Sequence, residues 1–457
     1  MNSRVSCLVC LSLLLSACAE YQTYTPAPID TEQTTREYRD RNLADPEIRN
    51  WLEENNHPQP QWPRKTWDIQ NLIQVAYLLN PELAIAKARV KAAEARLITA
   101  GQNPEPGIEV STEHHSRQEN GVSPWTIGAI FNWVYEKPEK RQTRIDYAKA
   151  MVEVERLRQF EVKWHIRDVI IDHYLDTITA THKKEMLLKE KSVLEEGLKL
   201  LQRSRDLGQS SDFELSSTRL EIQRTRLAIS EVEAELRRAQ SKLALSVGLP
   251  ANGLDTVELT TSEFIDLPDP NKSRLQTEEL QARALVERPD VLRVLSEYVV
   301  AEAALHKEIE NQFPNITLSP GFIFDQNDNI WVLAGSWLLP VTRNRGPIAE
   351  AEARRKVKEQ EFLAYQTKVL QEVHEARIGY ETALDTLSEA KKLVDEVQTA
   401  LKKISQQYDR GFTDRLSLIR AQLEVLLAQR SSYLLEIEAW RAFNRLEDAV
   451  MTRLTEH

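Results

Sequence analysis

The residue types that usually carry catalysis or bind metals are present, but their spacing assembles no site. The chain has 9 histidines, and none stands in a His-x-x-x-His or His-Glu-x-x-His pattern that would place two ligands on one helix face. His114 and His115 are adjacent, so in a strand their rings point to opposite faces, and we interpret them as exposed loop residues at the end of a hairpin rather than a metal site. Carboxylates in long helical stretches ordinarily serve solvation and i,i+4 pairing. We expect no catalytic residue, no metal site and no enzymatic activity.

One cysteine carries a clearer chemical signal. Residues 1–17 have the features of a secretion signal, with Arg4 before an apolar stretch that is too short to span a bilayer. The segment ends in Leu15-Ser16-Ala17-Cys18, which is similar to a bacterial lipobox, where a diacylglycerol joins the cysteine sulfur and the chain is cut before it. The alternative is an ordinary signal peptide with a chance cysteine. We expect Cys18 to be the lipidated first residue of the mature chain.

Cysteine usage agrees with lipidation. Cys7 and Cys10 lie in the segment expected to be removed, so Cys18 is left as a lone thiol in an oxidising compartment. Disulfides and cysteine-based metal sites are therefore excluded from the mature chain, and the only expected attached group is the covalent lipid, palmitate included. Ala19 and Glu20 follow, and the absence of Asp after the cysteine fits, by resemblance, sorting to the outer membrane.

Composition and charge bound the fold and the partners. The chain has 457 residues with only 13 Gly, and Ala, Leu, Glu, Arg and Lys dominate after residue 66, which favours long helices. The formal net charge of -11 leaves no basic face for a run of phosphates, so we expect no nucleic-acid partner. Residues 18–65 are polar, contain several prolines and show no sustained period, and we interpret them as a lipidated tether that leads to the folded part.

After the tether the chain repeats itself. We place one repeat at residues 66–250 and the second at 276–457, joined by a linker at 251–275 that is rich in Pro, Asp and Thr. Asn80-Pro81-Glu82-Leu83 opens an Ala-rich helix in the first copy, and Arg288-Pro289-Asp290-Val291 opens one in the second. Proline falls in the first helical turn both times, where its missing N–H costs nothing.

Each repeat then predicts two strands followed by a long helical column. The strands are expected at about 107–114 and 125–135, and again at 315–324 and 330–339 around the loop Asp325–Asn329. The columns run from about Arg144 to Asp206 and from about Ile348 to Asp409, which at 1.5 Å per residue is about 90 Å each. Each column stops at a glycine turn, and a further helix runs back from it.

The strands predict their surroundings. In 125–135, the residues Ile127, Ala129, Phe131, Trp133 and Tyr135 share one apolar face, whereas Thr126, Gly128 and Asn132 share the other. In 330–339, the residues Trp331, Leu333, Gly335, Trp337 and Leu339 alternate with Val332, Ala334 and Ser336. This pattern is typical of a transmembrane β-strand, although a soluble sheet packed on helices fits these strands alone equally well. Four strands cannot close a barrel, and an open edge is not tolerated in lipid, so we expect several chains to pool their strands.

The repeated pattern resembles the TolC-like outer-membrane efflux proteins, over about residues 66 to 455. Three segments carry the resemblance: Leu338–Gly346 followed by Ile348–Arg354, which looks most like the metal-cation branch; Tyr408–Gly411 with Ala421-Gln422; and Gly208–Arg219. The resemblance implies a mainly helical fold with a small β part, built from two helix-strand-strand-helix-helix repeats. Three such chains would share a twelve-stranded transmembrane β-barrel and a long α-helical barrel in the periplasm.

The same resemblance implies a function and its partners. It predicts a lipid-anchored outer-membrane homotrimer that serves as the passive duct of a tripartite efflux system for small toxic solutes or metal cations. Its partners would be a hexameric periplasmic adaptor and an inner-membrane transporter, proton-driven as the first expectation and ATP-driven as the other. The alternatives are a type I secretion duct and a helical envelope lipoprotein that forms no pore.

The two glycine turns are the expected adaptor-docking tip. Its residues are Gly208, Gln209, Gly411 and Phe412. Glycine accepts the positive φ that such a turn needs, and the simpler interpretation is that each glycine only caps its helix.

The resemblance also supplies candidates for the periplasmic entrance. They are Glu214, Tyr408, Asp414, Ser417 and Arg420. Ser417 and Arg420 occupy positions at which related proteins carry acidic residues. This difference argues against a cation-selective entrance. Arg420 faces either the tunnel or its neighbours Glu424 and Glu214.

We expect mass spectrometry of the mature protein to find its N-terminus at Cys18 with lipid attached. One acyl chain binds a membrane only marginally, whereas a triacylated cysteine together with a barrel holds firmly. Cys18→Ser should therefore remove the lipid and still leave the barrel able to insert. A mature chain that begins elsewhere, or an unmodified Cys18, contradicts the lipobox interpretation.

Overall fold

The computed structural model describes residues 23–57, 61–117, 121–208, 210–260, 266–270 and 275–454. The chain divides into two compact units between Arg41 and Asn42. The first unit contains helix α2 (Thr31–Asp40), which Asp30 caps by accepting hydrogen bonds from two backbone N–H groups of the first turn. No side chain of α2 is buried. The second unit contains both repeats.

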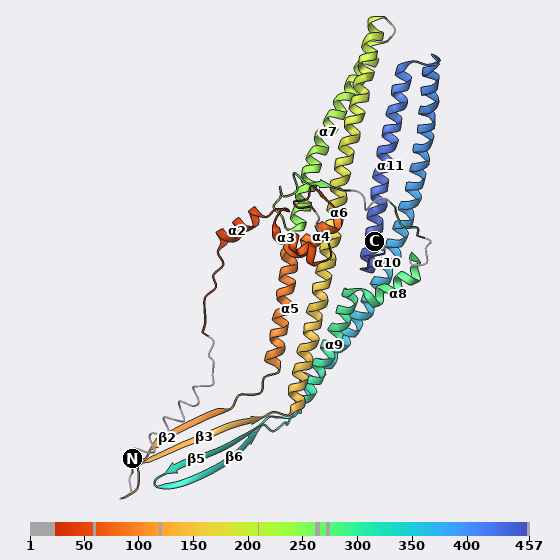
Figure 1. Cartoon of the computed structure of the whole chain (residues 1–457). Helices are drawn as coiled ribbons and strands as arrows, with labels where there is room; N and C mark the ends of the chain where they lie inside the picture. The colour runs from red at the N-terminus through yellow and green to blue at the C-terminus, as the bar shows by residue number, and fades with distance from the viewer. Residues whose placement is uncertain are drawn as a thin grey trace. The chain divides into compact units, whose positions relative to one another are not determined.

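The second unit confirms the repeated order of elements (Figure 1). The first copy consists of α4 (Ile69–Leu79), α5 (Pro81–Ala100), β2 (Gly107–His114), β3 (Trp125–Tyr135), α6 (Pro138–Asp206) and α7 (Asp212–Val247). The second consists of α8 (Thr277–Glu287), α9 (Pro289–Glu310), β5 (Ile316–Asp325), β6 (Asp328–Trp337), α10 (Arg345–Asp409) and α11 (Arg415–Val450). Among the described residues, no helix is both long and apolar enough to cross a lipid bilayer.

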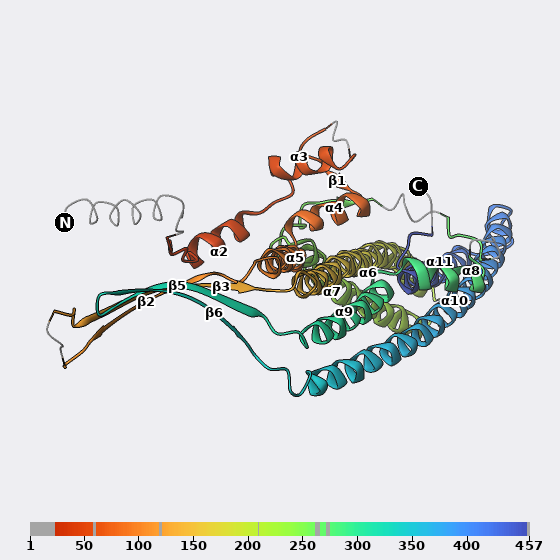
Figure 2. The ribbon, with the colours of Figure 1, turned by 90° about the horizontal axis from the view of Figure 1, so that it is seen from below.

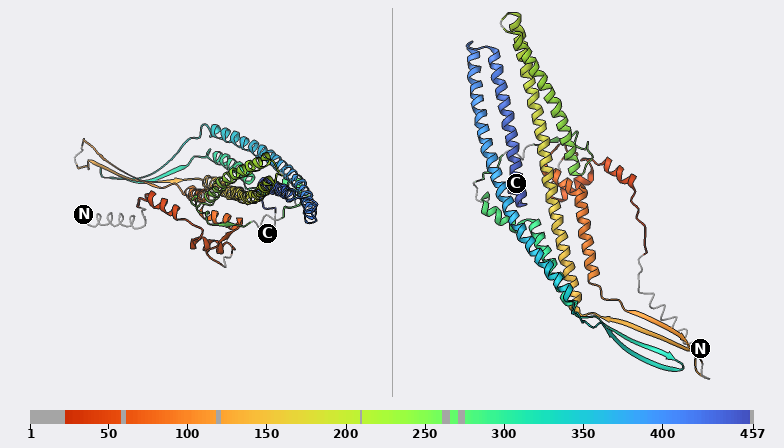
Figure 3. Two further views of the ribbon diagram at one scale, coloured as in Figure 1. Left: turned by 90° about the horizontal axis from the view of Figure 1, so that it is seen from above. Right: turned by 180° about the vertical axis from the view of Figure 1, so that it is seen from behind.

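The two columns are longer than the sequence predicted. Helix α6 has 69 residues and α10 has 65, so each extends about 100 Å at 1.5 Å per residue. Helix α6 begins at Pro138 rather than near Arg144, because proline is well accommodated at the first helical position. Within the second unit, α6 forms one hairpin with α7, and α10 forms another with α11 (Figures 1 and 3).

Part of the tether predicted at residues 18–65 forms short helices that the sequence analysis did not predict. Besides α2, this segment forms α3 (Pro46–Glu54), which Asp45 caps and which buries Ile48 and Leu52. These two residues are four positions apart, so they lie on one helix face. The helical period is only one turn long and lies among prolines, so the sequence analysis did not detect it. The compact unit accordingly begins at Asn42 rather than at residue 66.

The described parts of the predicted linker contact both repeats. A short parallel pairing joins β1 (Thr66–Trp67) to β4 (Glu258–Leu259). Tyr174 of α6 donates its hydroxyl to the backbone oxygen of Thr260, and Tyr380 of α10 donates to that of Pro268 at 2.5 Å. Both tyrosines are fully buried in the main core, so the linker is anchored to the two columns rather than hanging free between the repeats.

The four long strands form one antiparallel sheet in the order β2-β3-β5-β6 (Figure 2). The turn between β5 and β6 is shorter than the expected five-residue loop, because Asp325 and Asp328 already pair. Only Gln326 and Asn327 remain in the turn, both with positive φ (47° and 78°), as a tight hairpin requires. Strands β2 and β6 form the two edges of this sheet.

A buried ion-pair network holds the start of α9 to the other helices. Arg288 donates to Asp290 at 2.6 and 3.0 Å, to Glu372 of α10 at 3.0 Å and to the backbone oxygen of Ala449 in α11 at 2.7 Å. Tyr365 also donates to Asp290, at 2.7 Å. Burial acts to raise the pKa of Asp290, but the hydrogen bonds and charge of Arg288 outweigh it and hold the pKa below its ordinary value.

We expect Arg288→Met to destabilise the fold by about 3–5 kcal/mol, because it leaves Asp290 buried without its cation. Adding Asp290→Asn should recover much of this loss, since the uncompensated charge is then gone. Thermal or denaturant unfolding of the purified protein measures both. Because the folded pKa of Asp290 is lowered, its contribution in the wild type is present above the unfolded pKa and is lost on acidification. Equal stability of the single and double variants would contradict this account.

Candidate functional site: a two-faced sheet and two hairpin tips

The sheet has one strongly apolar face and one more polar face. The predicted alternation in β3 is confirmed, since Ile127, Ala129, Phe131, Trp133 and Tyr135 are all exposed while the residues between them are more covered. The register aligns this face across all four strands. The cross-strand pairs on it include Ile108–Phe131, Trp133–Leu318, Phe322–Trp331, Pro320–Leu333 and Ile316–Trp337.

Exposure on the apolar face is extreme for residues of this type. Trp331 is 82% exposed and Leu333 is 79% exposed. Leu339, which we predicted on the same strand, lies beyond the end of β6 at Trp337. Exposed apolar side chains that adjoin one another in this way mark a contact with lipid or protein.

Aromatic rings gather at both ends of this face. Trp133 and Tyr135 lie near the helical end of β3, with ring centroids 6.2 Å apart, and Trp337 pairs into the same region. Trp125 lies at the opposite end, against the ring of His114 at 4.7 Å. Aromatic side chains at the ends of an apolar band are typical of strands that cross a bilayer.

The histidine pair belongs to the rim of the sheet. His115 is hydrogen-bonded through its Nε2 atom to the Thr126 hydroxyl at 2.9 Å, and that hydroxyl donates to Asp325. Within the described part of the chain, no three His, Cys, Asp or Glu side chains are grouped so as to hold a metal ion.

The hairpin tips show why glycine stands at each turn. Gly208 follows α6 with φ +74°, and Gly411 follows α10 with φ +76°. At the second tip, Phe412 N–H donates to the Gln407 oxygen at 2.8 Å and Gly411 N–H donates to the Tyr408 oxygen at 2.9 Å. This pair of bonds is the Schellman arrangement that ends many helices. Gln209 lies outside the described residues.

The acidic entrance candidates cap helices. Glu214 takes part in a capping box at the start of α7, where its backbone N–H donates to the Ser211 hydroxyl at 3.2 Å and its carboxylate accepts from Ser211 N–H. Asp414 caps α11 by accepting from Ser417 N–H at 2.7 Å. The bonds from Ser417, together with the charge of Arg420, hold the pKa of Asp414 below its ordinary value. The Ser-x-x-Glu pattern of the capping box is readable from the sequence, and we missed it.

Arg420 and Tyr408 have different surroundings. Arg420 is exposed, and within the described residues it forms no ion pair with Glu424 or Glu214. The ring of Tyr408 contacts Arg415, a residue that the sequence analysis did not select as an entrance candidate. The guanidinium of Arg415 stands 5.6 Å from the Tyr408 ring centroid and pairs with Glu196 of α6 at 2.8 Å.

Comparison with known proteins finds matches of one kind in sequence and in structure. Residues 72–249 match the family described as outer membrane efflux protein. The pyoverdine export outer membrane protein OpmQ of Pseudomonas putida is 24% identical, over 95% of this chain and 94% of that protein. The cation efflux system protein CusC of Escherichia coli is 22% identical, over 83% of this chain and 84% of that protein.

The chain is similar to the TolC-like outer membrane efflux proteins in sequence and in fold. The solved outer-membrane channel OprN superposes with a TM-score of 0.66 at 18% identity, over 94% of this chain and 98% of that one. The Vibrio cholerae outer membrane protein VceC gives a TM-score of 0.67 at 17% identity, over 85% of this chain and 97% of that one. The family resemblance of the sequence is thereby confirmed.

A row of polar contacts joins the two hairpins along α6 and α11. We call this row the α6–α11 seam. Its pairs are Glu196–Arg415, Glu190–Arg430, Asp176–Arg441, Asp168–Asn444, Arg167–Glu447 and Trp164–Asp448. Sequence reasoning missed the seam because its partners lie more than two hundred residues apart.

One seam carboxyl is strongly perturbed. Burial, aided by the nearby charge of Asp448, raises the pKa of Asp168 to about 6, although the 2.6 Å hydrogen bond from Asn444 opposes the shift. Because this folded-state pKa is raised, the protonated form stabilises the seam in acid, and that contribution is lost as the pH rises through about 6.

We expect Gly411→Ala to loosen the second tip, because a side chain at φ +76° costs about 1–2 kcal/mol. Hydrogen exchange of the Phe412 N–H and of the last turn of α10 should speed up accordingly. Gly379→Ala is the matched control. Gly379 lies inside α10 with open space around it, so alanine there should stabilise by about 0.5–1 kcal/mol. Unchanged exchange at Phe412 would contradict the strain argument.

Proposed function

We propose that this chain is the outer-membrane channel of a tripartite efflux system, in which three copies form one passive duct. The observation that carries the proposal is the four-stranded sheet with an exposed apolar face and two open edges, β2 and β6. In lipid, every backbone N–H and C=O of such an edge must find a partner.

The number of strands supports pooling between copies. Four strands are too few to close a barrel, whereas three copies give twelve, with β6 of one copy pairing with β2 of the next. Strand β3 has 11 residues, a length that suits a tilted transmembrane strand. The apolar face, which includes Phe131 and Leu333, then contacts lipid, and the face with Thr126, Asn132 and Ser336 lines the duct.

The hairpin tips suit a docking role for a periplasmic adaptor. Exposed apolar side chains stand beside both glycine turns: Leu207 and Phe213 at the first, and Phe412 at the second. Exposed apolar side chains at helix ends form a surface that a second helical hairpin can cover. An inner-membrane transporter, proton-driven as the first expectation, supplies the driving force, since nothing proposed for this chain consumes energy.

The N-terminal lipid completes the proposed placement. Cys18 lies outside the described residues, and we propose that its lipid holds the chain at the periplasmic side of the outer membrane while the helical columns extend into the periplasm. The relatives are named for different cargoes, pyoverdine and cations among them, so the cargo of this chain is left as small toxic solutes or metal cations.

We expect Leu333→Lys to block assembly, because a lysine on the lipid-facing side costs about 2–4 kcal/mol near the bilayer midplane. Ser336→Lys is the matched control, since Ser336 lies on the opposite face of the same strand. The readouts are heat-resistant trimers on gels and ion conductance in planar bilayers. The wild type and Ser336→Lys should form conducting trimers, and Leu333→Lys should not.

The same experiment separates the rival functions. Normal trimers and conductance in Leu333→Lys would mean that the sheet faces are assigned wrongly. A wild type that never conducts would instead support a structural lipoprotein without a pore.

A further inference from the structure

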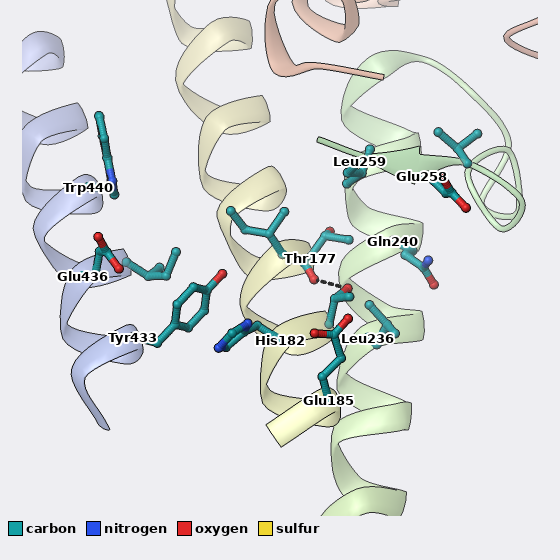
Figure 4. Close-up of a pocket in the computed structure, with 14 residues that line it drawn as sticks. Thr177, His182, Glu185, Leu236, Gln240, Glu258, Leu259, Tyr433, Glu436 and Trp440 are labelled. Carbon is teal, nitrogen blue, oxygen red and sulfur yellow. Dashed lines mark hydrogen bonds between the residues drawn. The ribbon is translucent and has the colours of Figure 1, made fainter. Parts of the chain in front are cut away.

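A cavity of about 730 Å³ opens within the α6–α11 seam. Its walls come from α6, α7 and α11 and from the segment around β4, so both hairpins contribute to it (Figure 4). The volume lies in the range of pockets that hold drug-sized ligands. The cavity is separate from the sheet and from the hairpin tips.

Aromatic and aliphatic side chains form much of the wall. Tyr433 of α11 and His182 of α6 point toward one another in Figure 4, and their rings stack with centroids 3.6 Å apart. Ile178, Ile437 and Trp440 add apolar surface. The cavity therefore offers flat surfaces that suit a planar aromatic ring.

The charge of the lining is negative only. Glu185, Glu258 and Glu436 line the cavity, and the lining contains no Lys or Arg. Among the described residues, neither Glu185 nor Glu258 has a cation within 4 Å, and Glu436 has only the exposed Lys391 at 3.9 Å.

Basic groups of α6 offset this charge only in part, since the charge of Lys189 acts on His182 in the cavity wall. Lys183 and Lys184 of α6 lie next to the cavity but pair with Glu235 and Glu233 of α7, at 3.1 and 3.0 Å. Burial lowers the pKa of His182, although Glu185 opposes the shift, so the imidazole is neutral near neutral pH.

We propose that this seam cavity binds a planar aromatic organic cation. The carboxylates of Glu185 and Glu436 attract its charge, and it packs on the Tyr433 face that is turned away from His182, since a cation over an aromatic face gains attraction from the ring quadrupole. A small anion is disfavoured by three carboxylates, and an uncharged aromatic lacks their attraction. Because the walls belong to both hairpins, the bound cation bridges them and stabilises the seam by mass action.

Equilibrium binding of ethidium to the purified full-length protein in detergent tests the proposal, read by fluorescence anisotropy against protein-free micelles. The Glu185→Gln/Glu436→Gln double variant keeps the shape of the cavity and should weaken binding about tenfold. Tyr433→Phe should bind like the wild type, whereas Tyr433→Leu should bind several-fold more weakly, because only the phenylalanine retains an aromatic face.

Two controls keep the result specific. Glu438→Gln removes the same charge from the same helix, but Glu438 pairs with Arg445 away from the cavity, so binding should not change. Phenanthridine, which is uncharged near neutral pH, should bind at least several-fold more weakly than ethidium. Ethidium should also raise the melting temperature of the wild type by more than that of the double variant at the same concentration.

Wild-type affinity in the double variant would overturn the proposal, since ethidium would then be held elsewhere, for example in the duct. Equal binding of phenanthridine would overturn it as well. If the double variant does not assemble, Glu185→Gln alone replaces it, with an expected loss of about threefold, because this side chain is exposed. The proposed channel function is tested separately by conductance, so either idea can fail without the other.

Discussion

The contact between the two hairpins depends on the α6–α11 seam, where hydrogen bonds and ion pairs recur from Glu196–Arg415 near the tips to Trp164–Asp448. Most of these pairs are partly exposed, and a partly exposed ion pair contributes little and is screened by salt. The buried Arg167–Glu447 pair is different, because breaking a buried pair by removing one partner leaves an uncompensated charge. The two hairpins are thus joined firmly at the Arg167–Glu447 pair and weakly toward the tips.

Strong contacts near the buried Arg167–Glu447 pair and weak contacts near the tips suit a duct whose tips change shape while the part around the apolar core stays fixed. The apolar core that contains Tyr174 and Tyr380 anchors both columns and the linker at the base. Toward the tips, the contact from α11 to α6 passes through Arg415 and Glu196, both substantially exposed. The proposed cation cavity lies between these two regions, where a bound ligand would add a contact across the seam.

The two repeats keep the same positions and use different chemistry at them. Asn80 caps α5 and donates to the backbone oxygen of Ser246 at the end of α7. At the equivalent position, Arg288 donates to the backbone oxygen of Ala449 at the end of α11. Each residue joins the start of one helix to the end of another, but only the arginine requires a buried counterion, which Asp290 supplies. The second repeat therefore joins these two helix ends through an ionic network, whereas the first repeat joins them through the side-chain amide of Asn80.

Local sequence determined the repeated elements, the two faces of β3 and the glycine turns, because period, helix-starting prolines and positive-φ glycines are each encoded within a few residues. It also held signals that we did not weigh, such as the Ser211–Glu214 capping box. Only the tertiary structure decided the β3–β5 pairing, the seam and its cavity. Their partners are far apart along the chain, and no local pattern states which carboxylate will meet which arginine once α6 and α11 lie side by side.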